Sequence, residues 1–221
     1  MSETTGLDCM DYSKSLDYIS RIYADTPRPR HQEYIDRTLT DDFVPVIEDE
    51  VADFFRVVLH LVSAQHVLEI GMSIGFSTSS IANAIKPHGG HVTSLEIDSD
   101  IVEFARKNFE RLGLEDSIEV RIGDASELIT EFESETFDVV FQDADKTLYP
   151  LLLDECIRVL KPGGLFLADD AFIPLRQDRE NWDARMESIH TFNKKVAHSR
   201  DLESTIIPIG DGITFAVKRT S

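Results

Sequence analysis

Residues 67–75 read VLEIGMSIG, a short apolar run that leads into Gly71 and Gly75. An apolar run of this length, followed by glycine and then by an amphipathic segment, is typical of a buried strand that turns into a helix. The two glycines permit a sharp turn and a close approach of a ligand to the backbone. The loop lacks both the dinucleotide fingerprint and the lysine of a phosphate loop, so it does not predict a phosphate ligand.

The alternation of apolar runs and amphipathic segments continues to the C-terminus and predicts an α/β fold. We expect a doubly wound sheet of seven strands, mostly parallel, with an antiparallel pair at the C-terminal end and helices on both faces. The expected strands are 67–70, 92–97, 118–122, 137–142, 164–168, 206–209 and 213–217. The expected helices are 77–85, 98–112, a segment around Leu128–Phe132, 149–160 and 181–197.

Residues 1–62 are expected to form a helical extension that packs on the same domain as the core, residues 63–221. One helix carries Ile19 and Ile22, and another carries Phe55 and Val58, at helical spacing. Such helices could cover the sheet, close over a site or bind a second subunit. Their sequence does not choose among these roles.

The charge of the chain disfavours nucleic acid as a partner. The formal net charge is -19 and the pI is near 4.6, whereas binding to phosphate backbones depends on clustered Lys and Arg. No stretch approaches the roughly 18 consecutive apolar residues of a membrane span. The polar residues 1–11 lack the apolar centre of a signal peptide, so we expect a cytoplasmic protein without a membrane partner.

Acidic residues follow two of the expected strands. The chain reads DADK at 143–146, after one strand, and Asp169-Asp170 after the next. Ligands bind at the carboxyl ends of strands in open α/β sheets, and carboxylates alone suit hard ions, with Mg²⁺ expected first and Mn²⁺ or Ca²⁺ as alternatives. The competing interpretation is that these aspartates only cap helices or face solvent.

Glu96 ends the second expected strand, about 20 residues after the glycine loop. An acidic side chain at this place can accept hydrogen bonds from both hydroxyls of a ribose. A ribose without a pyrophosphate points to S-adenosylmethionine. After the third strand, Asp124 and Ala125 would flank the adenine, although Asp124 is equally suited to cap a helix.

Taken together, the segments resemble the cation-dependent O-methyltransferases, the family that includes catechol and caffeoyl-CoA O-methyltransferases. The resemblance runs from about residue 45 to the C-terminus. It is carried by VLEIG at 67–71, GFS at 75–77, SLE at 94–96, GDA at 123–125, DADK at 143–146, ADD at 168–170, FN at 192–193 and IPIGDG at 207–212.

The resemblance implies a Rossmann-like fold, a homodimer and a small phenolic substrate with two vicinal hydroxyls. It implies that Lys146 is the catalytic base, although a lysine beside aspartates could simply balance their charge. The metal ligands would be Asp143, Asp169 and Asp170. The residues around S-adenosylmethionine would be Ile47, Glu69, Gly71, Met72, Ser73, Ser77, Glu96, Ile97, Asp124, Ala125 and Asp143.

Departures from the family leave some roles open. Many relatives carry Asp-Asn where this chain has Asp169-Asp170, and some catechol enzymes carry a larger aromatic residue in place of Ser73. Asp145 could contact a ligand or cap a helix, and Asn193 could lie beside the metal or be a buried polar residue. Alternative functions are methylation of a hydroxylated uridine in tRNA, a nicotinamide-dependent oxidoreductase, and a non-catalytic protein that binds cofactor or metal.

Overall fold

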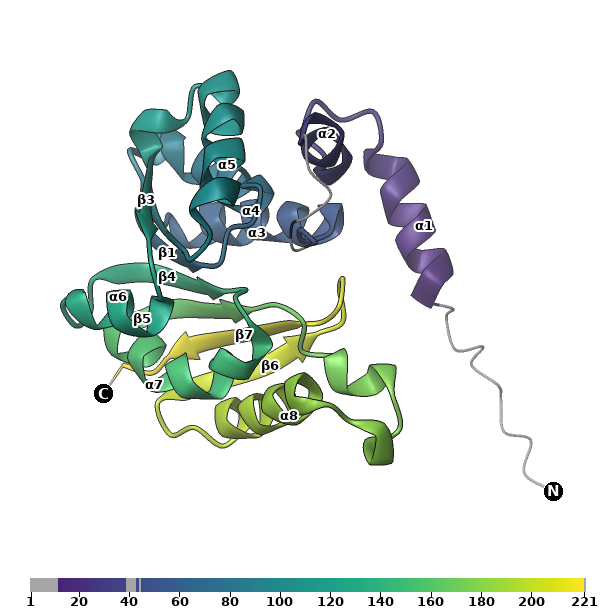
Figure 1. The fold of residues 1–221 in the computed structure, drawn as a ribbon, viewed down its shortest axis with the longest axis vertical. Coiled ribbons are helices and arrows are strands. Elements are labelled where there is room, and N and C mark those ends of the chain that lie inside the picture. The colour runs from purple at the N-terminus through teal and green to yellow at the C-terminus, as the bar shows by residue number, and fades with distance from the viewer. Residues whose placement is uncertain (1–11, 39–42, 44, 221) are drawn as a thin grey trace.

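A computed structural model describes residues 12–38, 43 and 45–220 of the chain, and the ribbon is drawn in Figure 1. One seven-stranded sheet runs through it in the order β3-β2-β1-β4-β5-β7-β6. The strands are β1 (His66–Ile70), β2 (His91–Glu96), β3 (Ile118–Ile122), β4 (Phe137–Gln142), β5 (Leu160–Ala168), β6 (Leu202–Ile207) and β7 (Ile213–Lys218). β1 to β5 are parallel, while β7 pairs antiparallel with both β5 and β6. The predicted fold class is therefore confirmed.

Helices cover both faces of this sheet. In chain order they are α1 (Tyr12–Tyr23), α2 (His31–Arg37), α3 (Asp49–Val62), α4 (Phe76–Ile85), α5 (Ser99–Leu112), α6 (Ala125–Leu128), α7 (Tyr149–Val159) and α8 (Ala184–Ala197). α3, α4 and α5 lie on one side of the sheet, and α6, α7 and α8 lie on the other (Figure 1). Short 3-10 turns, among them η4 (Lys146–Leu148), η5 (Ile173–Arg176) and η6 (Arg179–Asn181), connect several of these elements.

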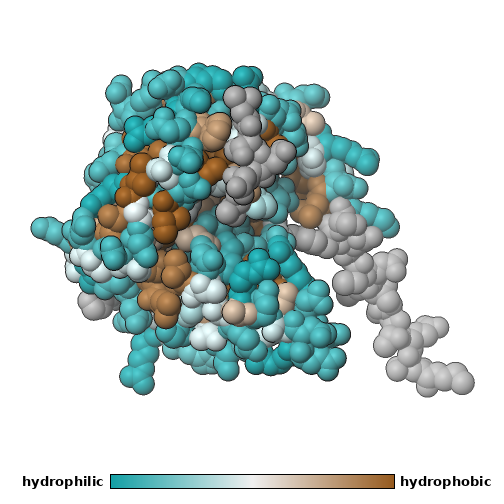
Figure 2. All heavy atoms as spheres, viewed as in Figure 1, coloured by the Kyte–Doolittle hydropathy of each residue, from teal (hydrophilic) through white to brown (hydrophobic). Residues whose placement is uncertain are grey.

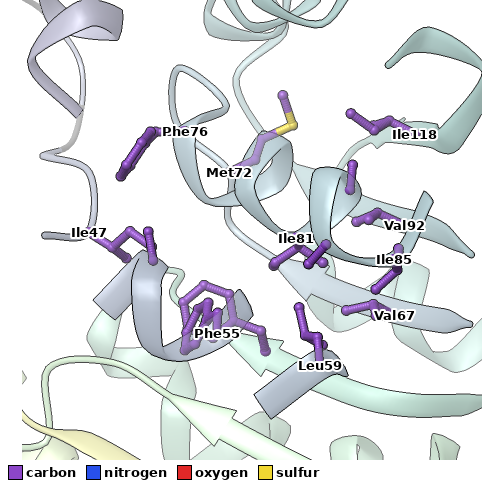
Figure 3. Close-up of a cluster of buried hydrophobic side chains, with 14 of the residues drawn as sticks. Ile47, Phe55, Leu59, Val67, Met72, Phe76, Ile81, Ile85, Val92 and Ile118 are labelled. Carbon is purple, nitrogen blue, oxygen red and sulfur yellow. The ribbon is translucent and has the colours of Figure 1, made fainter. Parts of the chain in front are cut away.

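Each face of the sheet buries its own hydrophobic cluster. On the first face, Phe55 and Leu59 of α3 and Ile81 of α4 close over Val67 and Val92 of the sheet (Figure 3). The ring of Phe55 packs edge-on against Phe141 of β4, with 4.6 Å between the ring centroids. Such packing removes large apolar surfaces from water, which is the main favourable term in folding. α3 is therefore part of the packed core.

Helix boundaries follow from local capping. Asp98 precedes α5 and accepts hydrogen bonds from the backbone N–H groups of Asp100 and Ile101, and Gly113 ends the helix in the left-handed region at φ 62°. α8 begins at Ala184, three residues later than expected, because Asp183 caps it by accepting a hydrogen bond from the N–H of Met186.

Two strand boundaries also differ from those expected. β5 begins at Leu160, which pairs with Phe137, and its register with β4 shifts before Val139. The proline and glycines at 162–164 therefore belong to an irregular strand start, where a turn was expected. β6 runs from Leu202 to Ile207 and ends before Pro208, since proline has no N–H to donate to β7.

The surface is mostly hydrophilic on the face shown in Figure 2, where hydrophobic side chains gather in separate small groups. The exposed hydrophobic side chains include Tyr18 and Ile22 of α1, and Val57 and Leu61 of α3. Among the helices that the structure describes, none combines the length and the apolar character needed to cross a membrane.

Candidate active site

The carboxyl ends of β1 to β5 bring the predicted site residues to one edge of the sheet. Gly71 follows β1, Glu96 ends β2 and Asp124 follows β3, while Asp143 follows β4 and Asp169 follows β5. β1 and β4 are neighbours, and the chain continues outward from them in opposite directions. In open α/β sheets, ligands bind outside the carboxyl ends of the strands at such a reversal. We call the ends of β1, β2 and β3, with the expected cofactor residues, the cofactor half of the site. The ends of β4 and β5, with the expected metal ligands, are the metal half, and the two halves meet between β1 and β4.

Lys146 lies at the centre of the metal half. Its Nζ atom is 2.7 Å from Oδ1 of Asp143, 2.8 Å from Oδ2 of Asp170 and 3.1 Å from Oη of Tyr149. The lysine stands at the start of η4, where Asp145 caps the turn by accepting a hydrogen bond from the N–H of Thr147 at 2.8 Å. Lys146 therefore bridges the ends of β4 and β5.

The carboxylates of Asp143, Asp169 and Asp170 form an acidic cluster whose negative charge exceeds the positive charge beside it. Asp169 is 5% exposed, and burial, followed by repulsion from Asp143 and Asp170, raises its pKa well above the usual value. Burial alone would lower the pKa of Lys146, but the neighbouring carboxylates outweigh it and raise that pKa. Lys146 is accordingly a firmly protonated ammonium in this state.

The acidic cluster fits a hard cation in its chemistry, because its ligands are oxygen atoms with surplus negative charge. Its conformation fits the ammonium instead. Asp143 and Asp170 are turned toward Lys146, and within the described ranges no three His, Cys, Asp or Glu side chains are arranged to hold a metal ion. Asp170 adopts φ 64°, a left-handed conformation that aspartate and asparagine tolerate better than most residues.

Further charged residues surround the same edge. Glu48, which precedes α3, has a pKa raised to about 7 by burial first and then by the charges of Asp211, Glu50 and Asp170. Arg176 of η5 pairs with Asp211 and lies 3.6 Å from Asp170. The cluster of Asp143, Asp169 and Asp170 thus has acidic neighbours from the N-terminal and C-terminal parts of the chain.

In the cofactor half, Glu96 holds the glycine loop. Its Oε2 accepts hydrogen bonds from the backbone N–H groups of Met72 and Ser73, each at 3.1 Å. Its Oε1 accepts from the N–H groups of Ile97 and Asp98 at 2.8 and 3.1 Å. A carboxylate has about four acceptor positions, so these amides use its capacity. A ribose would have to share or replace some of these bonds.

Glu69 of β1 is fully buried beneath this loop. Its Oε2 accepts hydrogen bonds from the hydroxyls of Thr78 at 2.5 Å and Ser94 at 2.7 Å, while its Oε1 has no hydrogen-bond partner. Burial raises its pKa from 4.5 to about 7, although the hydrogen bonds from Thr78 and Ser94 oppose the shift. The carboxyl group therefore lies near the midpoint of its titration at neutral pH.

The structure places the other predicted cofactor residues in two groups. Ile47 and Met72 point into the hydrophobic core, and Ser77 and Ala125 are buried at the starts of α4 and α6. Ser73, in the left-handed region at φ 47°, and the exposed Ile97 lie at the loop surface, while Asp124 caps α6 through the N–H of Ser126.

The glycines of the loop make close protein contacts. A Cβ atom at Gly71 would lie 2.5 Å from the carbonyl oxygen of Asp143, and one at Gly75 would lie 2.7 Å from the ring of Phe109. Gly71 therefore lets the cofactor loop pass against the first residue of the metal half. Gly75 serves the packing of α5.

Sequence reasoning did not single out Tyr149, Thr78 or Ser94 for the site. Tyr149 stands three residues after Lys146, and this spacing places two side chains on one helical face, so it could have been found. Thr78 and Ser94 carried no comparable signal, since their role depends on a buried carboxylate that reaches across from β1. Asn193 donates to the backbone oxygen of Ala171 at 2.8 Å.

A family model described as O-methyltransferase matches residues 32–219 of the chain. The protein belongs to this O-methyltransferase family. It is therefore an enzyme, an S-adenosylmethionine-dependent O-methyltransferase, as the sequence resemblance implied.

Named relatives agree with this membership. The chain is 28% identical over 173 residues to a catechol O-methyltransferase of Niastella koreensis, an alignment that covers 74% of this chain and 78% of the relative. It is 28% identical over 183 residues to a caffeoyl-CoA O-methyltransferase of Populus kitakamiensis, with 78% and 76% covered.

Solved structures of O-methyltransferases share the fold. An O-methyltransferase of Bacillus cereus in complex with SAH superposes with a TM-score of 0.78 at 24% identity, covering 91% of this chain and 97% of that one. TomG of Streptomyces achromogenes, in complex with SAM, superposes with a TM-score of 0.81 at 19% identity, covering 96% and 100%.

The buried Glu69 predicts a pH-dependent stability. The pKa of Glu69 is raised from 4.5 to about 7 in the folded protein. The stability that the protonated side chain contributes is therefore fully present below pH 4.5 and is lost as the pH rises through about 7. Charging it above pH 7 costs up to about 3 kcal/mol, a cost that E69Q avoids. In urea unfolding, the free energy of unfolding of E69Q relative to the wild type should increase between pH 5 and pH 8.

The matched control is E103Q, which removes a carboxylate from the exposed face of α5. If the free energies of unfolding of E69Q and the wild type differ by the same amount at pH 5 and pH 8, Glu69 does not titrate in this range.

Proposed function

We propose that this O-methyltransferase transfers the methyl group of S-adenosylmethionine to one hydroxyl of a small aromatic molecule with two vicinal hydroxyls. A catechol or a hydroxycinnamate is the expected acceptor, and the names of two relatives, a catechol and a caffeoyl-CoA O-methyltransferase, support this class. The observation that carries the proposal is the meeting of Lys146 with the carboxylates of Asp143 and Asp170 at the strand ends.

We infer that Asp143, Asp169 and Asp170 hold a divalent cation, with Mg²⁺ as the first expectation and Mn²⁺ or Ca²⁺ as alternatives. When bound, such a cation lowers the pKa of a hydroxyl beside it. The buried position and surplus charge of Asp169 support this assignment.

Lys146 is the proposed base. It would take the proton of the acceptor hydroxyl, so that the oxygen can form a bond to the methyl carbon. S-adenosylmethionine would supply that methyl group, with the electrons of the broken carbon–sulfur bond staying on sulfur. No covalent enzyme intermediate is needed, so acceleration comes from holding oxygen, carbon and sulfur in line. Lys146 can accept a proton only after its ammonium group has lost one. Asp143 and Asp170 stabilise the ammonium, so this loss requires that the two carboxylates interact with another cation instead.

The cofactor is assigned to the ends of β1, β2 and β3. Glu96 would accept hydrogen bonds from the ribose, Ala125 would lie against the adenine, and Glu69, Gly71 and Ser77 would surround the rest. The remaining proposed cofactor residues are Ile47, Met72, Ser73, Ile97, Asp124 and Asp143. Of these, Ile47 and Met72 would act from the core by supporting the loop.

The reaction is tested by transfer of a labelled methyl group to a panel of catechols and hydroxycinnamates. Turnover should appear with Mg²⁺ and fall at least about a hundredfold after treatment with a chelator, because the acceptor hydroxyl keeps its proton. Undiminished turnover of metal-free protein in excess chelator would reject the metal-assisted reaction.

Glu96 is expected to control cofactor affinity. E96Q replaces one carboxylate oxygen by an NH₂ group, which cannot accept from the amides of the loop or from a ribose. Calorimetric titration with S-adenosylmethionine should show an affinity about tenfold weaker or more, since at least one charge-assisted hydrogen bond is lost. E103Q again serves as the control, and an unchanged affinity of E96Q would remove Glu96 from the cofactor site.

We also propose a cytoplasmic homodimer that associates through the exposed side chains of α1 and α3, among them Tyr18, Ile22, Val57 and Leu61. Joining two copies through these faces would bury apolar side chains that water now covers. Sedimentation velocity should give about twice the mass of one chain, and L61E should lower it. A single species of one-chain mass at micromolar concentration would contradict the dimer.

A further inference from the structure

Lys146 has three hydrogen-bond partners in this structure, and an ammonium group has three N–H donors. Asp143 and Asp170 receive two of the donors at 2.7 and 2.8 Å, and Tyr149 receives the third at 3.1 Å. The side chains of all three charged residues are less than one-fifth exposed. The ammonium thus lies between two carboxylates that belong to different strand ends.

The third carboxylate of the cluster is oriented differently. Oδ1 of Asp169 accepts a hydrogen bond from the backbone N–H of Asp170 at 2.7 Å, and no ion pair joins Asp169 to Lys146 in the described part of the chain. The three carboxylates therefore do not point to a common centre. Those of Asp143 and Asp170 contact Lys146, whereas that of Asp169 contacts the backbone.

We propose that the ammonium group of Lys146 and a divalent cation are alternative occupants of the Asp143–Asp170 carboxylate pair. This inference rests on the proposed metal site. Lys146 neutralises the two carboxylates in the metal-free protein and must withdraw from them when the cation binds. The same movement frees the two N–H donors that Asp143 and Asp170 now accept.

Tyr149 is a positioning residue for this exchange. Its hydroxyl donates to the backbone oxygen of Gln142 at 3.1 Å, which leaves the oxygen free to accept from Lys146. The ring is fully buried and packs edge-on against Phe192, with centroids 5.2 Å apart. Because this oxygen is uncharged and fixed by the packing of the ring, it can keep its hydrogen bond to Lys146 when the lysine leaves the carboxylates.

The exchange predicts that Lys146 weakens metal binding. In K146Q the carboxylate pair has no resident cation, so calorimetric titration should show Mn²⁺ binding about tenfold tighter than in the wild type at low salt. Without metal, K146Q should melt at a lower temperature than the wild type, because its carboxylates repel one another. Added Mn²⁺ should raise its melting temperature by more than it raises that of the wild type.

Two variants serve as controls. K146R keeps the positive charge and should bind Mn²⁺ with an affinity close to that of the wild type. K161Q removes a lysine that pairs with Asp138 at 2.6 Å, at the opposite end of β4, and should leave Mn²⁺ affinity unchanged. K146R also keeps the test valid if K146Q does not fold, since a tenfold tighter Mn²⁺ binding by K146R would contradict competition between charges.

The outcomes separate this inference from the proposed function. Equal or weaker Mn²⁺ binding by K146Q, beside clear binding by the wild type, overturns the competition and leaves the metal site standing. Binding by K146Q alone supports the competition and contradicts metal assistance in the native enzyme. No binding by either protein at millimolar Mn²⁺ overturns both.

Tyr149 is tested by kinetics. Y149F keeps the buried ring and removes only the hydroxyl, so kcat should fall about tenfold while the KM for the acceptor stays the same, as expected when a proton acceptor is misplaced. Unchanged kcat would show that Tyr149 does not position Lys146.

Discussion

A single ammonium group shared by two partly buried carboxylates is the interaction on which the candidate site depends. Charges at the ends of β4 and β5 lie too close together to be stable alone, and Lys146 offsets two of them. Removing one partner from such a cluster is costly because the remaining charge stays buried. In the structure the offsetting cation is the ammonium of Lys146, and this requirement ties the position of the lysine to the charges of Asp143 and Asp170.

The two halves of the site are joined by backbone. Gly71 passes so close to the carbonyl of Asp143 that a side chain would not fit, and the N–H of Asp143 donates to the oxygen of Ile70 at 2.8 Å. The cofactor loop and the first acidic residue therefore share one rigid contact, at the place where the strand order reverses. The position of the glycine loop is therefore fixed relative to Asp143 by backbone contacts alone.

Sequence reasoning predicted the elements whose signals are local. The strand ends at Gly71, Glu96 and Asp143 follow from apolar runs and glycine, and they place the site at one edge of the sheet. It could not predict that Lys146 faces Asp170, because that contact joins residues from two strand ends. The boundaries of β5 and β6 were shifted for the same reason, since pairing with β4 and β7 extended both strands beyond their apolar runs.

Glu69 and Glu96 show how one residue type acquires two roles from its surroundings. Glu96 accepts four backbone N–H groups, so its negative charge is well compensated and the loop is ordered by it. Glu69 accepts from two hydroxyl groups, its Oε1 atom has no hydrogen-bond partner, and its side chain is not exposed to solvent. Burial dominates for Glu69 and raises its pKa to about 7. The carboxylate at the surface thus orders the loop through backbone amides, while the one beneath it supports the loop from the core.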